Sequence, residues 1–221
     1  MRTVCCWAVA AAILILLYTT RFDTLAREYL ASAYAIGNVL VELGCGLLIV
    51  LGLPKPVASH LRVHFVICWL AGMIALAVWY APPFLIASLR SGPLRLLQAA
   101  TWIVGGVLLY LPLYSPDPKR RIKPFPQGII YLFSAAVFSS LLSLFIGFTR
   151  FGLYRPYLAP PDTLHILTAL QGRFALSPDM DQQTACLMMW VLSCFVWLWS
   201  VMAMFWRLYH ERDRVPLTRA S

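Results

Sequence analysis

The chain alternates long apolar stretches with short polar connections. A membrane-spanning helix needs about 20 mostly apolar residues, and six stretches approach or exceed that length. They cover residues 4–20, 30–53, 63–80, 94–114, 128–148 and 184–208. The connections are short except for residues 149–183. This pattern predicts an all-α polytopic membrane protein, a six-transmembrane-helix bundle in which residues 1–221 form one membrane-embedded domain.

The densest polar sequence lies directly before the last stretch. Ser177 is typical of a helix N-cap, and Pro178 suits the first helical position, where its missing N–H would be unpaired in any residue. Asp181 falls at the end of the first turn, where the positive end of the helix dipole favours a carboxylate. We call residues 177–183 the collar. We expect it to hold the 149–183 connection or a partner protein by hydrogen bonds, through Asp181, Gln182 and Gln183 together with Tyr154 and Tyr157.

The second stretch carries polar side chains at one helical spacing. Tyr34, Asn38, Glu42 and Cys45 follow one another at intervals that place them on one face of an α-helix. Glu42 lies near the middle of the span, where a carboxylate costs about 2.5–3.5 kcal/mol unless it is protonated, paired or hydrated. We expect this face to point into the bundle. Glu42 is then either a protonated group bonded to a neighbouring helix or part of a functional site.

Composition and charge agree with a membrane protein. Hydrophobic residues make up 61% of the chain and charged residues 12%, which excludes an ordinary soluble domain. The net charge of +9 resides mainly in the connections, where it sets topology and does not indicate nucleic-acid binding. Eleven of the 18 basic residues lie on the side that holds both ends of the chain. This asymmetry predicts a bacterial inner membrane protein with both termini cytoplasmic and residues 149–183 on the outer side.

The sequence contains few groups that could carry chemistry. No nucleophile elbow, phosphate-binding loop, dinucleotide fingerprint or zinc-protease motif occurs, so we expect no enzyme. The six cysteines form no CxxC pair and are expected to be unpaired packing residues. Soft ligands that favour Cu(I) do gather near the last stretch, although methionines in an apolar helix are ordinarily packing residues. They are Met180, Cys186, Met188 and Met189, with His165 before them.

The collar carries a family resemblance. Asp181-Gln182-Gln183, followed by Leu187, Met189, Trp190 and Val191, resembles the Asp-Gln-Gln-x-x-x-Leu-x-Met-Trp-Val signature of CtaG-like cytochrome c oxidase assembly factors. Further segments around Tyr131 and Tyr154 are similar to that family. The resemblance covers residues 32–208.

The resemblance implies a role in assembling haem–copper oxidases, with copper delivered through histidines near the outer face. The positions that match those histidines here hold Tyr34, Asn38, Tyr80, Leu96 and Ala100. Tyrosine and asparagine are poor Cu(I) ligands beside imidazole or thiolate. We therefore expect no cofactor.

The resemblance and the missing histidines together predict a non-enzymatic accessory or structural subunit of a haem–copper cytochrome c oxidase. Its expected partners are the oxidase core subunits and membrane lipids, not nucleic acid, with Trp190 among the partner-binding residues. The alternative is an active copper-insertion factor that uses the soft ligands named above.

Overall fold

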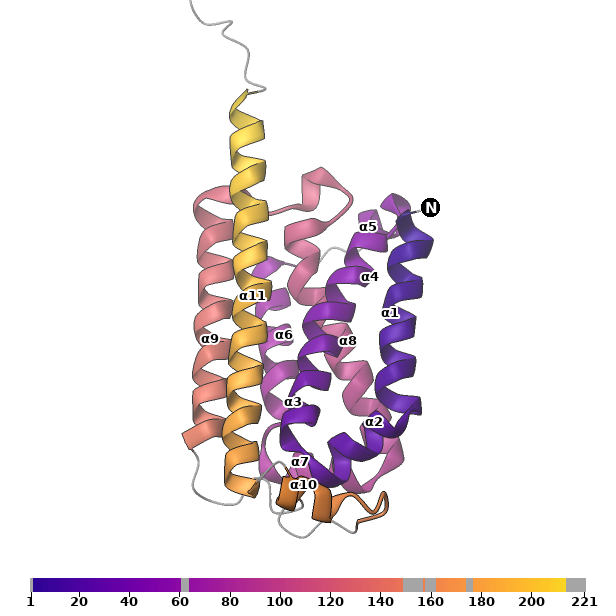
Figure 1. Ribbon diagram of the computed structural model, residues 1–221. Helices are drawn as coiled ribbons and strands as arrows, with labels where there is room; N and C mark the ends of the chain where they lie inside the picture. The colour runs from indigo at the N-terminus through magenta and orange to yellow at the C-terminus, as the bar shows by residue number, and fades with distance from the viewer. Residues whose placement is uncertain (1, 61–63, 149–156, 158–161, 174–176, 214–221) are drawn as a thin grey trace, which may run out of the picture.

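A computed structural model describes residues 2–60, 64–148, 157, 162–173 and 177–213, and these residues form helices joined by turns, with no strand among them. Figure 1 shows an elongated bundle. Four helical segments are long and apolar enough to cross a membrane, and six are if each of two bent pairs counts as one span. The all-α, polytopic membrane fold predicted from the sequence is therefore confirmed.

The first half of the described chain contains α1 (Arg2–Thr19), α2 (Arg21–Thr24), η1 (Leu25–Tyr29), α3 (Ala31–Val39), η2 (Leu40–Cys45), α4 (Gly46–Gly52), α5 (Lys55–His60), α6 (Phe65–Val78) and α7 (Pro82–Arg90). The second half contains α8 (Gly92–Tyr114), η3 (Pro118–Arg120), η4 (Pro124–Gly128), α9 (Ile129–Phe148), α10 (Leu167–Arg173) and α11 (Pro178–Asp213).

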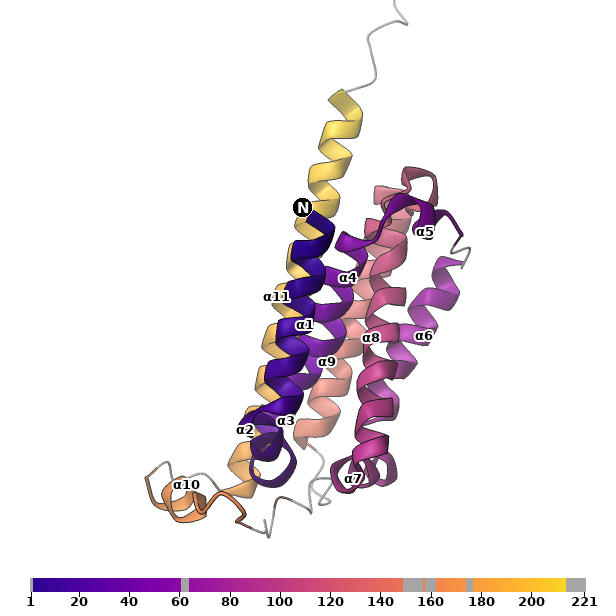
Figure 2. The same ribbon diagram turned by 90° about the vertical axis from the view of Figure 1, so that its right-hand side faces the viewer.

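The bundle has two ends, which can be followed in Figures 1 and 2. The start of α1, the short helix α5 and the far end of α11 lie at one end, which we call the N-terminal face. The elements α2, α7 and α10 lie at the opposite end, which we call the collar face because α11 begins there. The start of α1 and the end of α11 thus lie toward one face, as an even number of crossings requires.

Two spans bend sharply at the collar face. Residues Thr3–Thr19 and Arg21–Tyr29 meet at 57°, and the Thr20 hydroxyl caps the new helix by accepting from the Phe22 N–H at 3.1 Å. Residues Phe65–Val78 and Pro82–Arg90 meet at 69°. Proline lacks an N–H and fits the first turn of a helix, so the double proline starts α7. The sequence predicted a connector at 21–29 but missed α7.

The helices approach most closely where α8 passes η2 and α4. A Cβ atom on Gly46 would lie 2.6 Å from the Gly106 Cα, so these two backbones are in direct contact. Around this crossing the core is filled by large side chains that are fully buried, among them Trp102, Tyr110 and Trp197. Small residues at the crossing and large ones around it are the packing pattern of membrane helices.

The second span is not a regular α-helix. Its middle, η2, is a π-helical segment that contains Glu42. The Glu42 carboxyl lies beside Gly105 of α8, whereas the Cys45 thiol points to the Ala10 carbonyl of α1 at 3.7 Å. A wider turn changes the angle between successive side chains. The predicted common face of Tyr34, Asn38, Glu42 and Cys45 therefore ends at Glu42, because Cys45 belongs to a different interface.

The last helix begins where the sequence predicts and ends later. The Ser177 hydroxyl accepts from the Met180 N–H at 3.2 Å, and Pro178 is the first helical residue. From there α11 runs for 36 residues. At about 1.5 Å per residue this length far exceeds the hydrocarbon layer of about 30 Å. The helix consequently stands clear of the bundle at the N-terminal face (Figure 1).

Candidate functional site

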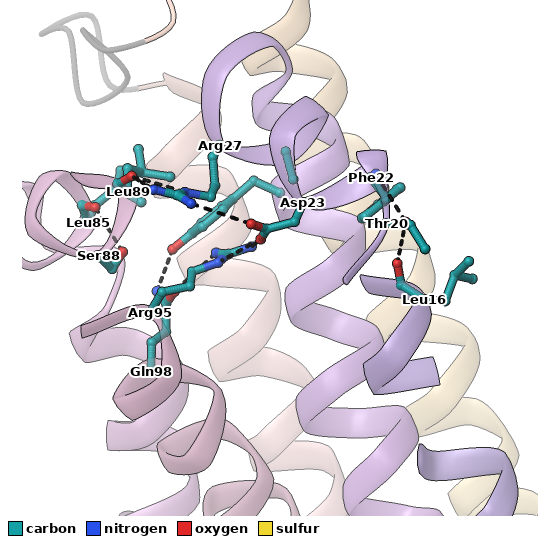
Figure 3. A network of polar contacts seen from close by, with 12 residues as sticks. Leu16, Thr20, Phe22, Asp23, Arg27, Leu85, Ser88, Leu89, Arg95 and Gln98 are labelled. Atoms are coloured by element: carbon teal, nitrogen blue, oxygen red, sulfur yellow. Dashed lines mark hydrogen bonds and ion pairs between the residues drawn. The ribbon is translucent and has the colours of Figure 1, made fainter. Parts of the chain in front are cut away.

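A buried arginine organises the polar groups at the collar face. Arg95 lies in the first turns of α8 and is only 7% exposed. Its guanidinium donates to one Asp23 carboxylate oxygen, at 3.1 and 3.3 Å, and to the Gln98 carbonyl oxygen at 3.2 Å (Figure 3). The rings of Tyr18 and Tyr34 lie 5.1 and 5.2 Å from its central carbon, close enough for cation–π attraction. The positive charge is thus neutralised and held in one place.

The hydrogen bonds continue inward from Arg95. The Gln98 amide donates to the Tyr34 hydroxyl at 2.5 Å, and the Asn38 amide donates to the Tyr80 hydroxyl at 2.9 Å. The Tyr34 and Tyr80 rings meet edge to face with centroids 6.4 Å apart. We call Tyr34, Asn38, Tyr80, Arg95 and Gln98 the polar cluster. All five side chains are buried, and the cluster joins α3, the end of α6 and α8.

A second arginine fixes the outer border of this cluster. Arg27 donates twice to the Leu89 carbonyl, at 2.8 and 3.1 Å, and lies 3.5 Å from the Asp23 carboxylate (Figure 3). The Leu89 carbonyl is near the C-terminus of α7, where carbonyls lack partners within the helix. Asp23 therefore stands between two guanidinium groups. Through these contacts, Arg27 and Arg95 hold α2, η1, α7 and α8 together at the collar face.

Asp181 makes bonds that the sequence did not predict. Its carboxylate accepts from the Ala31 N–H at 2.5 Å and from the Ser32 N–H and hydroxyl at 3.3 and 2.5 Å, and the residue is 3% exposed. It caps α3, whose own N-cap residue, Leu30, offers no side-chain acceptor. All three of these bonds go to the start of α3, and the expectation that Asp181 holds the 149–183 connection or a partner protein stays a prediction. The sequence does not reveal which helix end lies beside the carboxylate.

The other collar residues divide between bonded and exposed positions. The Gln182 amide donates to the Ile146 carbonyl of α9 at 2.9 Å, whereas Gln183 is exposed and Trp190 is 40% exposed. The Tyr157 hydroxyl donates to the Ala26 carbonyl at 2.6 Å, and burial raises the pKa of this hydroxyl well above its usual range. Tyr154 lies outside the described residues.

The described part of the 149–183 connection is anchored by residues that the sequence analysis missed. The Tyr29 hydroxyl donates to an Asp162 carboxylate oxygen at 3.1 Å and accepts from the Leu164 N–H at 2.6 Å. The same Asp162 oxygen accepts from the Ile166 and Leu167 N–H groups at 3.0 and 3.1 Å, at the start of α10. An Asp shortly before a helical segment is the sequence signal that could have indicated this cap.

The cap on α3 gives a direct test of Asp181. Asp181→Ala is expected to lower the free energy of unfolding by about 1–3 kcal/mol, because buried N–H donors at the start of α3 lose their acceptor. Asp179→Ala is the matched control, since Asp179 is exposed in the first turn of the same helix. Unfolding in mixed detergent micelles measures both. Equal stability of the two variants would show that the cap contributes nothing.

Glu42 lies inside the bundle but without the bonded partner that the sequence analysis considered. It is fully buried, and neither carboxyl oxygen has a hydrogen-bond partner among the described residues. A Cβ atom on Gly105 would lie 3.4 Å from one of these oxygens. An unpaired buried carboxyl group is far more stable in its neutral form. The role of Glu42 stays a prediction.

The soft ligands of the copper alternative do not share one surface. Cys186 and Met189 are buried, with the Cys186 sulfur packed against Gly147, whereas Met180 and Met188 are exposed. His165 is exposed in the turn before α10. Within the described ranges no group of three His, Cys, Asp or Glu could hold a metal ion. Burial therefore divides the donors of this alternative between the inside and the outside of the bundle. All six cysteines are free, as predicted.

The positions matched to family histidines separate into two groups. Tyr34, Asn38 and Tyr80 meet in the polar cluster, whereas Leu96 and Ala100 are exposed on the outside of α8. The residues of α8 that do face the cluster are Arg95 and Gln98. Their spacing of three residues, at the start of an apolar stretch, is the signal that could have identified them.

Comparisons with known proteins agree with the sequence signature. The family model described as cytochrome c oxidase caa3 assembly factor (Caa3_CtaG) matches residues 1–211. The matched range contains the polar cluster and the collar. No curated protein and no solved structure matches the chain.

Proposed function

The chain belongs to the family of cytochrome c oxidase caa3 assembly factors, and from this premise we propose that it is a copper-independent, non-enzymatic membrane partner of a haem–copper oxidase. In this proposal it binds oxidase core subunits as an accessory or structural subunit. It lies in the bacterial inner membrane with both termini in the cytoplasm.

The polar cluster is the observation that carries this proposal. Three positions that the resemblance matches to histidines are filled by Tyr34, Asn38 and Tyr80, whose polar groups bond within the cluster. Arg95 adds a fixed positive charge at the same place. That charge is already paired with Asp23, and the cluster offers a copper ion neither imidazole nor thiolate, the ligands that Cu(I) prefers among these side chains. The cluster supports a structural role, in which it holds the collar ends of three helices.

The outward side of α11 is the surface that we propose for the oxidase. Large apolar side chains are exposed along it, and the helix extends beyond the bundle. Between membrane helices, such side chains bind a partner through van der Waals packing. The exposed group includes Phe195, Leu198, Trp199 and Met202.

Purification of the tagged full-length chain in mild detergent tests the proposal. Oxidase core subunits are expected to co-purify with the chain. After the copper of the co-purified oxidase is subtracted, the copper content is expected to be far below one ion per chain. Trp199→Ala is expected to lower oxidase recovery, because it removes a large exposed ring from α11. Trp7→Ala is the matched control on α1, where Trp7 is 45% exposed.

The copper alternative predicts a different outcome in the same experiment. An active copper-insertion factor would carry one copper per chain and lose it on Cys186→Ala or Met189→Leu. It would also leave a separate oxidase poorly loaded with copper when the chain is deleted. Either result would replace the structural proposal. Absence of oxidase subunits from the purified sample would contradict the structural proposal.

A further inference from the structure

A groove opens between α6 and α9 near the N-terminal face. Its volume is about 350 Å³, and its lining is mainly aromatic and aliphatic, from Phe65 and Trp69 on one side and Ile130 on the other. Gln127 and Ser134 supply polar atoms. Ile130 is 64% exposed at the border of the groove. Because α9 is membrane-spanning and α6 belongs to a bent span, the groove opens toward lipid.

Two residues with nitrogen-bearing side chains lie close in the sequence to residues that line the groove. His64 directly precedes Phe65 and is exposed, and its Nδ1 atom accepts from the Val66 N–H at 3.3 Å. The proton of its neutral ring is therefore on Nε2, which leaves an N–H donor for a ligand. Lys123 is exposed directly before η4, and its carbonyl accepts from the Gly128 N–H at 2.9 Å. Its ammonium group makes no bond to the described residues.

A further donor lies deeper in the same groove. The Trp69 indole N–H is buried and has no hydrogen-bond partner among the described residues. Trp69 is five residues beyond His64 on α6, which is about 7.5 Å along the helix axis. The polar border of a bilayer is about 5–7 Å thick on each side. Trp69 thus lies near the depth of the ester carbonyls that link acyl chains to a lipid headgroup.

We infer that the groove binds one anionic phospholipid. One acyl chain lies between α6 and α9, an ester carbonyl accepts from Trp69, and the phosphate meets Lys123 and His64. A partner helix does not fit, because a helix with its side chains is about 10 Å across and the groove holds only about 350 Å³. The local charge favours an anion, since the loop before η4 contains one acid, Asp117, followed by four basic residues, Lys119, Arg120, Arg121 and Lys123.

Native mass spectrometry of the purified full chain tests this inference. The probes are phosphatidylglycerol and phosphatidylcholine with identical acyl chains. One phosphatidylglycerol is expected to be retained per chain, about fivefold more tightly than phosphatidylcholine. Lys123→Gln is expected to remove this preference, because one basic residue near an anionic lipid contributes about a fivefold change in binding. Lys55→Gln is the matched control, since Lys55 is also exposed at the N-terminal face.

A second variant separates the groove from general surface attraction. Ser134 lines the groove, and among the described residues its hydroxyl donates only to the Tyr131 carbonyl of its own helix, at 3.0 Å. Ser134→Phe fills the groove and is expected to reduce retention of both lipids. Equal retention of the two lipids by the natural chain would overturn the inference. So would an equal effect of Lys55→Gln and Lys123→Gln, or full retention after Ser134→Phe.

Discussion

Arg95→Met is expected to destabilise the bundle by about 3 kcal/mol, whereas Arg90→Met is expected to change its stability little. Removal of one partner from a buried ion pair leaves the other charge unpaired, and this costs about 3–5 kcal/mol. The low end of this range applies because the Asp23 side chain is 18% exposed, so water can hydrate its carboxylate once the Arg95 guanidinium is removed. The Gln98 carbonyl oxygen also loses its donor. Arg90 is exposed at the end of α7 and is the matched control.

Further variants test whether the loss of stability comes from the broken Arg95–Asp23 ion pair or from the changed shape of the side chain. Arg95→Lys keeps the charge but cannot reach Asp23 and Gln98 with a planar fork, so an intermediate loss is expected. Asp23→Asn combined with Arg95→Met is expected to lose less than the two single changes added together, because neither charge is then left alone. Unfolding in mixed micelles measures the natural chain, the four single variants (Arg95→Met, Arg90→Met, Arg95→Lys and Asp23→Asn) and the double variant. Strict additivity, or equal losses for Arg95→Met and Arg90→Met, would contradict the pairing.

Gly106→Ala is expected to have the second largest effect, about 3 kcal/mol. A Cβ atom there would overlap the backbone carbonyl oxygen of Glu42 on the facing span. A flexible side chain could rotate away, but a backbone carbonyl cannot, so the helices must separate. Overpacking typically costs about 1–3 kcal/mol, and the upper end applies at a backbone crossing. Loss of folded protein in detergent, measured by size-exclusion chromatography and unfolding, checks the expectation.

Gly44→Ala is the control for this substitution. A Cβ atom on Gly44, two residues from Glu42 on the same span, would meet nothing within 4 Å. Alanine is the better helix former by about 1 kcal/mol, so Gly44→Ala is expected to leave stability unchanged or to raise it. Equal stability of Gly106→Ala and Gly44→Ala would contradict the backbone contact between α8 and η2.

Hydropathy predicted the large-scale fold well. Five of the six predicted apolar stretches begin and end within about two residues of helix limits in the structure, because the cost of placing polar groups in lipid limits an apolar stretch. The start of α11 was also predictable, since Ser177 and Pro178 act locally. The helices α7 and α10 were missed because both are short and lie at the collar face, where periodicity is weak.

The candidate site was harder to predict for a physical reason. Its residues come from α2, α3, α6 and α8, and their partners are set by which helix ends lie together. Asp181 illustrates this, because its local sequence fits its own helix while its carboxylate caps α3. Arg95 was not singled out from the sequence, although it is buried. Tyr34 and Asn38 were identified from spacing alone because both lie before η2, where the α-helical period still holds.

The π-helical segment η2 acts as a phase shift between the two halves of one span. Before it, Tyr34 and Asn38 face the polar cluster, and after it Cys45 faces α1. Loss of a single residue from Leu40–Cys45 would turn one half by about 100° relative to the other. Either the polar cluster or the α1 interface would then be lost. The length of this segment, rather than any one of its side chains, sets which neighbours the second span can have at once.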